Sequence, residues 1–367
     1  MSVIILSATN VSTISRSFGP DELTSLMSRV FYSLSQSPSG SSAEIQQPSR
    51  ISISTSNHTA LFMPSRISLM GTAIKVVSVP TLSAPQDVRE NGLPASTLVL
   101  DERTGAVKAL VNARHLTALR NAAGSLLATR LLVPPSTPPR TLLAIGAGAQ
   151  VSAHVSLFLR YFRTIISCTI LNRARNSRLL NLVSALEKEY PLVCFDTGTL
   201  LGQPEDTEAH LQSAIEQADI IVTATSSTRS LFPSAYVRPG THLCLIGSYT
   251  PNMHEIDSEL VRRAGKIVVD SRDACMTEAG ELISAGLGPS DLIELGELVQ
   301  FEGSLADDAP WLPRDALIQQ VRDSGDITIF KSVGVGLQDV AIASAVVARA
   351  EKDRIGLIAS EYDTGGD

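Results

Sequence analysis

The feature that most constrains this chain is a strand-like run, a glycine-rich turn and a helical pattern over residues 141–162. Four apolar residues lead into Gly146 and Gly148, and apolar residues recur behind them at helical spacing. In a dinucleotide site, Gly146 would allow the sharp turn and Gly148 would let the backbone approach a pyrophosphate at the helix N-terminus. Val151 replaces the third glycine of that fingerprint, so the pattern also fits an ordinary strand–turn–helix unit.

The second predicted strand of this region, residues 165–171, ends in a basic stretch. NAD sites usually carry Asp or Glu about 20 residues after the glycines, where it binds the ribose 2′-hydroxyl. Here Asn172 and Arg173 occupy that place, and Arg175 and Arg178 follow closely. No carboxylate would repel a 2′-phosphate, and guanidinium groups pair well with phosphate. The sequence therefore favours NADP(H) over NAD(H), although a solvated basic loop is the alternative.

The composition restricts the classes of protein to which this chain can belong. The 367 residues suggest two domains, and 44% hydrophobic with 18% charged residues is typical of a globular protein with sizeable cores. The net charge of −7 gives no sign of a nucleic-acid binder, and the four scattered cysteines show no metal spacing, so we expect reduced thiols and no metal. No apolar run reaches the ~18 residues of a membrane span. The first residues lack the features of a signal peptide, and a cytoplasmic location is expected.

The first 130 residues are rich in predicted strands with antiparallel character. A long Ala-rich helical pattern over residues 115–132 carries Arg120, and the proline-dense stretch 133–140 predicts a domain boundary. Short apolar or alternating runs predict strands over residues 2–8, 50–56, 60–64 and 70–79, and a hairpin over residues 96–111. A helical pattern covers residues 21–34.

Beyond residue 140, strand and helix patterns alternate, which predicts βαβ units and a parallel, doubly wound sheet. Residues 223–226 would lie at the carboxyl end of a strand, where such sheets bind ligands. Gly334 and Gly336 precede the last helix and either contact the cofactor or only give a flexible helix entry. The tail after Lys352 is expected to be frayed. The predicted strands end near Ile145, Leu171, Phe195, Thr225, Gly247 and Asp270.

Taken in order, several stretches resemble the ornithine cyclodeaminase/mu-crystallin family. The resemblance implies an α/β fold in which a Rossmann domain is inserted in a second α/β domain that binds substrate and forms a homodimer. It places the substrate-binding and dimerisation domain at residues 1–133 plus 330–367, and the NAD(P)-binding domain at 134–329. The matching stretches, which together span nearly the whole chain, are residues 71–75, 116–123, 145–150, 218–225, 269–282, 327–334 and 338–339.

The resemblance also implies three cationic site residues. Arg50 and Arg120 would bind the carboxylate of the substrate, and Lys75 would be catalytic at the reacting centre. The chemistry agrees, because an arginine clamp fits a carboxylate and a lysine can shift its pKa and exchange protons. Surface charge is the alternative at each position. The residues expected to contact the cofactor are Asn121, Gly146, Gly148, Ala149, Gln150, Asn172, Arg173, Arg175, Thr223, Ala224, Thr225, Ser248, Ser332, Val333 and Gly334.

Two positions depart from the pattern that the resemblance implies. Cyclodeaminases carry an Asp just after the glycine that ends the fifth strand of the Rossmann domain, whereas no carboxylate follows Gly247 here until Glu255. Mu-crystallin-like members also lack that Asp and resemble imine reductases. Asn121 stands where the family usually has Thr, and its amide can donate a similar hydrogen bond to a pyrophosphate.

These observations lead to three hypotheses. The first is an NADPH-dependent reductase of a cyclic imino acid such as a pyrroline- or piperideine-2-carboxylate. The second is an ornithine or lysine cyclodeaminase that uses NAD, or another amino-acid dehydrogenase of the family. The third is a cofactor-holding, crystallin-like protein without turnover. The expected partners are a small imino or amino acid and a second copy of the chain, with neither nucleic acid nor membrane.

Overall fold

The computed structural model describes residues 2–37, 44–90, 92–200, 204–303, 305 and 309–362. The chain forms two compact units. The first comprises Met1–Arg120, Gly303–Ala309 and Val335–Asp367, and the second comprises Asn121–Glu302 and Pro310–Gly334. The chain leaves the first unit inside a helix, earlier than the proline-dense stretch at 133–140. The helix residues after Arg120 bond into the second unit, as the Ser125 hydroxyl does with His154.

An eight-stranded sheet forms the first unit within the described residues, in the order β18-β1-β7-β6-β5-β4-β2, with β3 paired to β4. Its pairs are antiparallel except for β1 and β7, which are parallel. The predicted antiparallel, strand-rich region is therefore confirmed. The strands are β1 (Val3–Leu6), β2 (Ile45–Gln46), β3 (Ile51–Ser54), β4 (His58–Ile67), β5 (Gly71–Pro80), β6 (Ala95–Leu100), β7 (Val107–Asn112) and β18 (Leu357–Ala359).

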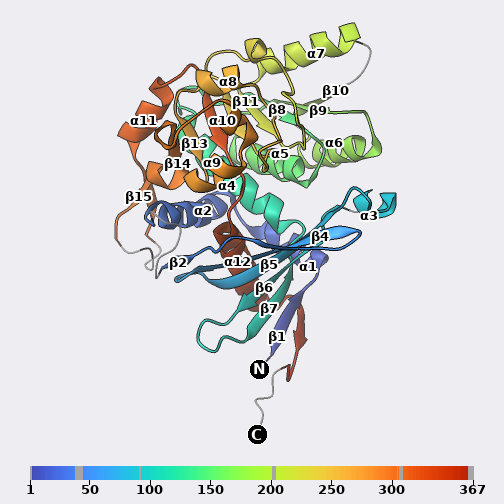
Figure 1. Ribbon diagram of the computed structural model, residues 1–367, viewed down its shortest axis with the longest axis vertical. Helices are drawn as coiled ribbons and strands as arrows, with labels where there is room; N and C mark the ends of the chain where they lie inside the picture. The colour runs from blue at the N-terminus through green and yellow to red at the C-terminus, as the bar shows by residue number, and fades with distance from the viewer. Residues whose placement is uncertain are drawn as a thin grey trace. The chain divides into compact units, whose positions relative to one another are not determined.

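One face of this sheet is covered by helices (Figure 1). The long helix α12 packs on β4 to β7 and against α2, and it is buried on most of its surface. The residues on the covered face include Ala73, Val99 and Ala109, all nearly inaccessible to solvent. The helices are α1 (Ala8–Ser17), α2 (Pro20–Ser35), α3 (Gln86–Glu90) and α12 (Gly336–Asp353), and α4 (Leu116–Leu132) begins in this unit.

The tail after α12 was expected to be frayed, but residues 357–359 are ordered as a strand. These residues form β18, which pairs antiparallel with β1 and extends the edge of the sheet. Arg354 ends α12 in the left-handed conformation, and Gly356 has a φ of +116°. The turn brings the tail back to the sheet, where its backbone groups are paired.

The second unit holds a parallel, doubly wound sheet, as predicted. Its order is β10-β9-β8-β11-β12-β17-β13-β14, and each pair is parallel. The order reverses direction between β8 and β11, which is the switch point where such sheets bind ligands. The strands are β8 (Thr141–Ile145), β9 (Ser167–Asn172), β10 (Cys194–Thr199), β11 (Ile220–Thr223), β12 (His242–Leu245), β13 (Ile267–Val269), β14 (Leu292–Glu294) and β17 (Thr328–Lys331).

Helices flank both faces of this sheet (Figure 1). The strands β11, β12 and β13 are fully buried, as expected for a parallel sheet that is covered on both sides. A small hairpin consists of β15 (Val299–Phe301) and β16 (Trp311–Pro313). The helices are α5 (Ala149–Tyr161), α6 (Ser177–Glu189), α7 (Pro204–Gln217), α8 (Ser258–Arg263), α9 (Arg272–Glu278), α10 (Gly280–Ser284) and α11 (Asp315–Asp323), with short 3₁₀ turns at Ser234–Tyr236, Pro289–Asp291 and Leu295–Leu298.

The third strand of this unit is longer than predicted. The apolar run suggested an end near Phe195, whereas β10 continues to Thr199 in register with β9. Its last four residues are Asp-Thr-Gly-Thr and contain no apolar run, so the hydrophobic pattern alone does not reveal this part of the strand. Within the described ranges, no helix is long and apolar enough to cross a membrane.

Two histidines lie in the core of the second unit in neutral form. His154 Nδ1 donates to the Gln150 carbonyl at 2.7 Å, and Nε2 lies 2.9 Å from the Ser125 hydroxyl. His242 Nδ1 lies 2.8 Å from the Thr328 hydroxyl. Burial lowers the pKa of His154 to about 4 and that of His242 to about 3, from an ordinary 6.5. Neither histidine is therefore charged in the folded state at neutral pH.

We predict that acid destabilises the second unit through these two histidines. In the unfolded chain each takes up a proton below pH 6.5, whereas the folded pKa values are lower, so stability is complete above about pH 6.5 and falls as the pH drops toward 4. Between pH 7.5 and 5.5 each histidine costs about 1.4 kcal/mol. The urea midpoint of unfolding, measured at both pH values, should therefore decrease at the lower pH.

The variants His154→Gln and His242→Gln should each reduce this pH dependence. The matched control is His115→Gln, which replaces an exposed histidine just before α4 and should leave the dependence unchanged. An equal loss of stability at pH 5.5 in all three variants and in the parent chain would contradict the prediction.

Candidate active site

The glycine turn between β8 and α5 has the geometry that the sequence predicts. Gly146 has a φ of +120°, and a Cβ there would lie 2.9 Å from the Ala224 carbonyl oxygen and 3.2 Å from Val151 Cγ2. No L side chain fits this position without strain. Val151 is fully buried and packs beneath the turn.

Gly148 has a different role, because the protein's own packing does not require it. It precedes α5 with an extended backbone, and a Cβ there would meet no atom within 4 Å. α5 begins without a side-chain cap, Ala149 is exposed, and Gln150 Oε1 is buried without a hydrogen-bond partner among the described residues. Open space beside a helix N-terminus and an unsatisfied amide oxygen fit a ligand that the backbone approaches closely.

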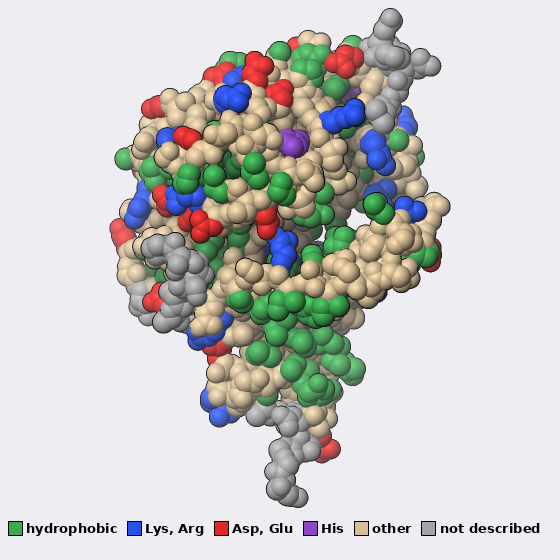
Figure 2. All heavy atoms as spheres, viewed as in Figure 1, with side chains coloured by type: hydrophobic (Ala, Val, Ile, Leu, Met, Phe, Trp, Pro, Cys, Tyr) green, Lys and Arg blue, Asp and Glu red, His purple; other side chains and the backbone are tan. Residues whose placement is uncertain are grey.

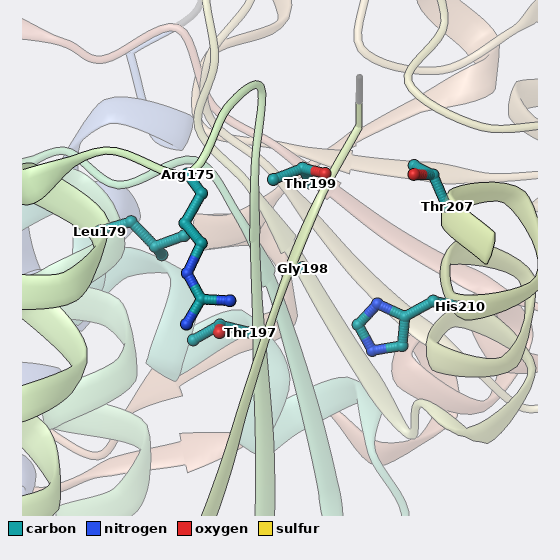
Figure 3. Close-up of a pocket in the computed structure, with 7 residues that line it drawn as sticks. All are labelled: Arg175, Leu179, Thr197, Gly198, Thr199, Thr207 and His210. Carbon is teal, nitrogen blue, oxygen red and sulfur yellow. The ribbon is translucent and has the colours of Figure 1, made fainter. Parts of the chain in front are cut away.

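The residues after β9 lie beside a cavity of about 430 Å³ (Figure 3). Arg175 is one of its lining residues, and Figure 3 shows its guanidinium directed toward Thr197 of β10. Asn172 and Arg173 do not line this cavity. The Asn172 amide donates to the Ala174 carbonyl at 2.9 Å and so shapes the loop. Of the predicted basic cluster, Arg175 is therefore the residue that faces a cavity.

The other wall of this cavity was not predicted from the sequence. His210 reaches it from α7, on the far side of β10 in Figure 3, and its Nε2 lies 2.7 Å from Asp196 Oδ2. Gly198 makes room for this ring, because a Cβ there would lie 2.5 Å from His210 Nδ1. The threonines 197, 199 and 207 also line the cavity and bring hydroxyl groups to it. Among the described lining residues, Arg175 carries the fixed positive charge of this polar cavity.

The loop after β11 is held by a buried glutamate. Glu255 Oε1 accepts from the Thr225 N–H at 2.7 Å and the Thr225 hydroxyl at 2.9 Å. Its Oε2 accepts from the Thr223 hydroxyl at 2.8 Å and the Gly247 N–H at 2.7 Å. Burial raises the pKa of Glu255, and the charge of Lys331 opposes this rise. The two threonine hydroxyls predicted for the cofactor thus already donate inside the unit, while Ala224 faces the glycine turn.

Ser248 also bonds inward. Its hydroxyl donates to the Met253 carbonyl at 2.8 Å, and its own carbonyl accepts from Lys331 Nζ at 2.6 Å. Lys331 forms a fully buried ion pair with Glu281 at 3.0 Å. A contact of Ser248 with a cofactor would therefore come from its backbone or from a lone pair of its hydroxyl.

The loop after β17 is fixed by Asp270. Asp270 Oδ2 accepts from the Ser332 hydroxyl and from the Gly334 N–H, both at 2.6 Å. Gly334 has a φ of +84°, so glycine is required there, and Val333 between the two is half-buried. One buried carboxylate thus sets the conformation of the segment that leads out of the second unit. The sequence patterns did not mark Asp270 or Glu255 for a role.

In the first unit, the predicted Lys75 and Arg120 lie together around a carboxylate that was not predicted to be a site residue. Lys75 Nζ lies 2.6 Å from Asp339 Oδ2, and Arg120 Nε lies 3.3 Å from Asp339 Oδ1. The side chains of all three are at most 5% exposed. Charges are buried in this way only when they are paired. The alternative that Lys75 and Arg120 are surface charges is therefore wrong.

Arg50 differs from these two cations. It lies just before β3, and its side chain is exposed. Its charge nevertheless reaches Lys75. Burial lowers the pKa of Lys75, the charges of Arg120 and Arg50 lower it further, and Asp339 opposes them. The structure thus places two of the three predicted cations, Lys75 and Arg120, on one carboxylate, while Arg50 acts on Lys75 through its charge.

Asn121 follows Arg120 in α4 and is the first residue of the second unit. It is buried, with 8% of its surface exposed. Its role toward a pyrophosphate stays a prediction.

We predict that Glu255→Gln destabilises the second unit by about 2–3 kcal/mol, because a buried donor would be left unsatisfied. Each oxygen of Glu255 accepts from one backbone N–H, so an amide NH₂ in either place faces a group that cannot accept. Thermal unfolding monitored by circular dichroism measures the effect. Glu187→Gln, at an exposed position of α6, is the matched control. Equal midpoints for the two variants would show that the carboxylate does not hold the loop.

Comparison with known proteins identifies relatives of this chain. A Delta(1)-pyrroline-2-carboxylate reductase from a strain of Bacillus cereus is 29% identical over 318 residues, which cover 84% of this chain and 87% of the relative. A ketimine reductase mu-crystallin from Mus musculus is 30% identical over 253 residues, 69% of this chain and 68% of the relative.

A solved structure shares the fold. It is the Thermococcus litoralis Delta(1)-pyrroline-2-carboxylate reductase in complex with NADH and L-proline, with a TM-score of 0.75 and 23% identity. The match covers 97% of this chain and 99% of that one. The family model described as the ornithine cyclodeaminase/mu-crystallin family matches residues 10–354, and this chain belongs to that family.

Proposed function

We propose that this chain is an NAD(P)H-dependent oxidoreductase that reduces the C=N bond of a cyclic imino acid, with NADPH as the preferred cofactor. The observation that carries the proposal is the buried cluster in which Lys75 and Arg120 share Asp339. Two cations and one carboxylate leave a net positive charge in a site with little water, and the nearby Arg50 adds to it. Such a site favours an anionic substrate.

The residues of this cluster can take separate roles in imine reduction. Arg120, with Arg50, would bind the carboxylate of the imino acid, for which a guanidinium is the fitting partner. Lys75 would hold a proton at the imine nitrogen, which makes the adjacent carbon a better hydride acceptor. Its lowered pKa suits this role, because a group whose pKa lies nearer to neutral exchanges protons more readily. Bound NADPH supplies the hydride.

Reduction fits this chain better than cyclodeamination. The residue after Gly247 is Ser248, which bonds inward, and the nearest following carboxylate, Glu255, is fully buried and accepts four hydrogen bonds. Neither side chain is available to activate a substrate amine. This agrees with the names of the two relatives from Bacillus cereus and Mus musculus, both of which are reductases.

The second unit has groups that fit a dinucleotide. The open space at Gly148 and the unsatisfied Gln150 amide oxygen fit the pyrophosphate and neighbouring hydroxyl groups. Arg175 at the cavity beside β9 and β10 supports a 2′-phosphate, and neither Asn172 nor Arg173 brings a carboxylate that would repel it. The expected cytoplasmic location stays a prediction.

We also propose a homodimer through the uncovered face of the first sheet. The strand registers put Pro64, Ile74, Leu98 and Leu110 on one row of that face, opposite the helices. Leu110 is 37% exposed, and Figure 2 shows apolar side chains gathered over β5, β6 and β7. An exposed apolar sheet face of this kind marks an interaction surface. A second copy of the chain is the occupant that the family resemblance favours.

We predict rapid oxidation of NADPH, followed by its near-UV absorbance, when the purified chain is mixed with 1-pyrroline-2-carboxylate or 1-piperideine-2-carboxylate. NADH should be a weaker cofactor, because Arg175 would pair with the 2′-phosphate. Oxidation of neither cofactor, together with ammonia release from ornithine or lysine, would contradict the proposal and indicate a cyclodeaminase.

The cofactor preference has its own matched variants. Arg175→Leu should raise the KM for NADPH by roughly 10- to 100-fold and leave that for NADH nearly unchanged, as loss of a charged hydrogen bond implies. Arg178→Leu removes an exposed cation of the same stretch that does not line the cavity, and should have little effect. If both substitutions raised the KM for NADPH equally, the preference would come from the overall positive charge of the loop and not from a contact between Arg175 and the 2′-phosphate.

For the dimer, we predict a mass in solution of twice the 39.0 kDa of the chain, measured by sedimentation equilibrium. Leu110→Glu should lower the mass toward that of one chain, because a charge would be buried in an apolar interface. Leu192→Glu, at a 93% exposed position of the second unit, is the control. A parent chain that sediments as a monomer would refute the proposal.

A further inference from the structure

Asp339 lies at a place where its side chain meets two cations at once. It belongs to the first turn of α12, and its carboxylate is 5% exposed. Oδ2 accepts from Lys75 Nζ of β5 at 2.6 Å, and Oδ1 accepts from Arg120 Nε of α4 at 3.3 Å. Each oxygen thus orients a different cation. The proposed reaction, as described above, uses Lys75 and Arg120 but gives Asp339 no part.

The start of α12 is fixed by polar contacts, so the position of Asp339 is well defined. Gln338 Oε1 accepts from Arg120 Nη1 at 2.6 Å, and Gln338 Nε2 donates to the Arg120 carbonyl at 3.3 Å. The Leu337 N–H donates to Gln47 Oε1 at 3.1 Å. Gly336 touches β4 so closely that a Cβ would lie 2.2 Å from the Ser65 hydroxyl oxygen. The helix therefore cannot shift by much without breaking these contacts.

We infer that Asp339 is a positioning residue of the proposed imine reduction, which holds the Lys75 ammonium and the Arg120 guanidinium in fixed orientations toward one bound imino acid. This inference rests on the proposed function. Its basis is the bridging geometry, since one carboxylate with two separate oxygens sets the direction of both cations. An Asn or a hydrophobic residue in its place would leave Lys75 and Arg120 to repel each other in a buried site.

The position of Asp339 also bears on the proton that the reaction consumes. The imine nitrogen gains a proton as the Nζ–H bond of Lys75 breaks, the imine carbon gains the hydride that NADPH supplies, and NADPH is oxidised to NADP⁺. Lys75 then takes a proton from water. Within the described residues, the charged groups that act most strongly on Lys75 are Asp339 of α12, Arg120 of α4 and Arg50 before β3, and of these three Asp339 favours the ammonium. Asp339 thus keeps Lys75, the proton donor, protonated at alkaline pH.

The test compares Asp339→Asn with the parent chain over a pH series. Loss of an opposite charge at hydrogen-bond distance should lower the pKa of Lys75 by about 1 to 3 pH units. The alkaline limb of the kcat profile should therefore move to lower pH by a similar amount, with a lower kcat at neutral pH. Gln338→Met is the matched control, since it removes a contact to Arg120 and none to Lys75. It should raise the KM for the imino acid without moving the limb.

A direct titration separates this inference from the proposed function. The chain has six lysines, and isotope labelling of their side chains lets the Lys75 signal be assigned with Lys75→Arg and titrated without turnover. A lower Lys75 pKa in Asp339→Asn supports the positioning role even if no cyclic imine is reduced. An unchanged Lys75 titration and an unchanged alkaline limb in a folded Asp339→Asn variant would overturn it.

A second variant covers the case in which Asp339→Asn does not fold. Asp339→Glu keeps the charge but displaces the carboxylate, so the alkaline limb should stay near that of the parent chain. The kcat should fall roughly 10- to 100-fold, as misplacement of a reacting group by about 1 Å implies. A kcat equal to that of the parent chain would contradict a positioning role.

Discussion

The burial of Asp339 between Lys75 and Arg120 is the interaction on which the arrangement of the first unit depends. A buried charge is stable only beside an opposite one, so the carboxylate of α12, the ammonium of β5 and the guanidinium of α4 stabilise one another. Removal of the carboxylate would leave two like charges in the core. The same constraint fixes the last helix on the sheet and keeps two cations aimed at a small region, which is what recognition of an anionic substrate requires.

Buried carboxylates also stabilise the second unit. There they accept hydrogen bonds from the backbone of loops, whereas Asp339 pairs with two cations. Glu255 ties the loop after β11 to the end of β12, and Asp270 ties the segment after β17 to the end of β13. Both accept backbone N–H groups that would otherwise lack partners at the carboxyl ends of parallel strands. These hydrogen bonds hold the loops in which cofactor contacts are predicted without the help of a ligand, and such preorganisation lowers the entropic cost of binding.

Much of the fold can be predicted from sequence where the signal is local. The apolar run before Gly146 and the helical spacing behind it are sufficient for β8, the turn and α5, and Gly146 has the positive φ that such a turn needs. Prediction fails where the pattern is weak. The end of β10 lacks an apolar run, and β18 depends on pairing with β1 at the other end of the chain. The helix α1, which begins with the capping serine Ser7, was not predicted either.

Prediction of the candidate site from the sequence has the same limit. Lys75 and Arg120 were found through a family resemblance, but their shared partner lies 264 residues from Lys75 in the sequence. No spacing rule connects positions so far apart. Asp339 was part of a matched motif, and only the packing of α12 on the sheet explains why a carboxylate is needed there. Arg175 could be proposed from the basic stretch, whereas Thr197, Gly198 and His210 required the true length of β10.

The most direct measurement of the central claim is the fate of the cofactor hydrogen. NADPH labelled with deuterium at C4, in each of its two stereochemical forms, would be supplied with 1-pyrroline-2-carboxylate, and the proline formed would be examined by mass spectrometry. We predict proline with a single deuterium at Cα from only one of the two labelled cofactors. Absence of labelled proline, with ornithine converted to proline and ammonia instead, would contradict it.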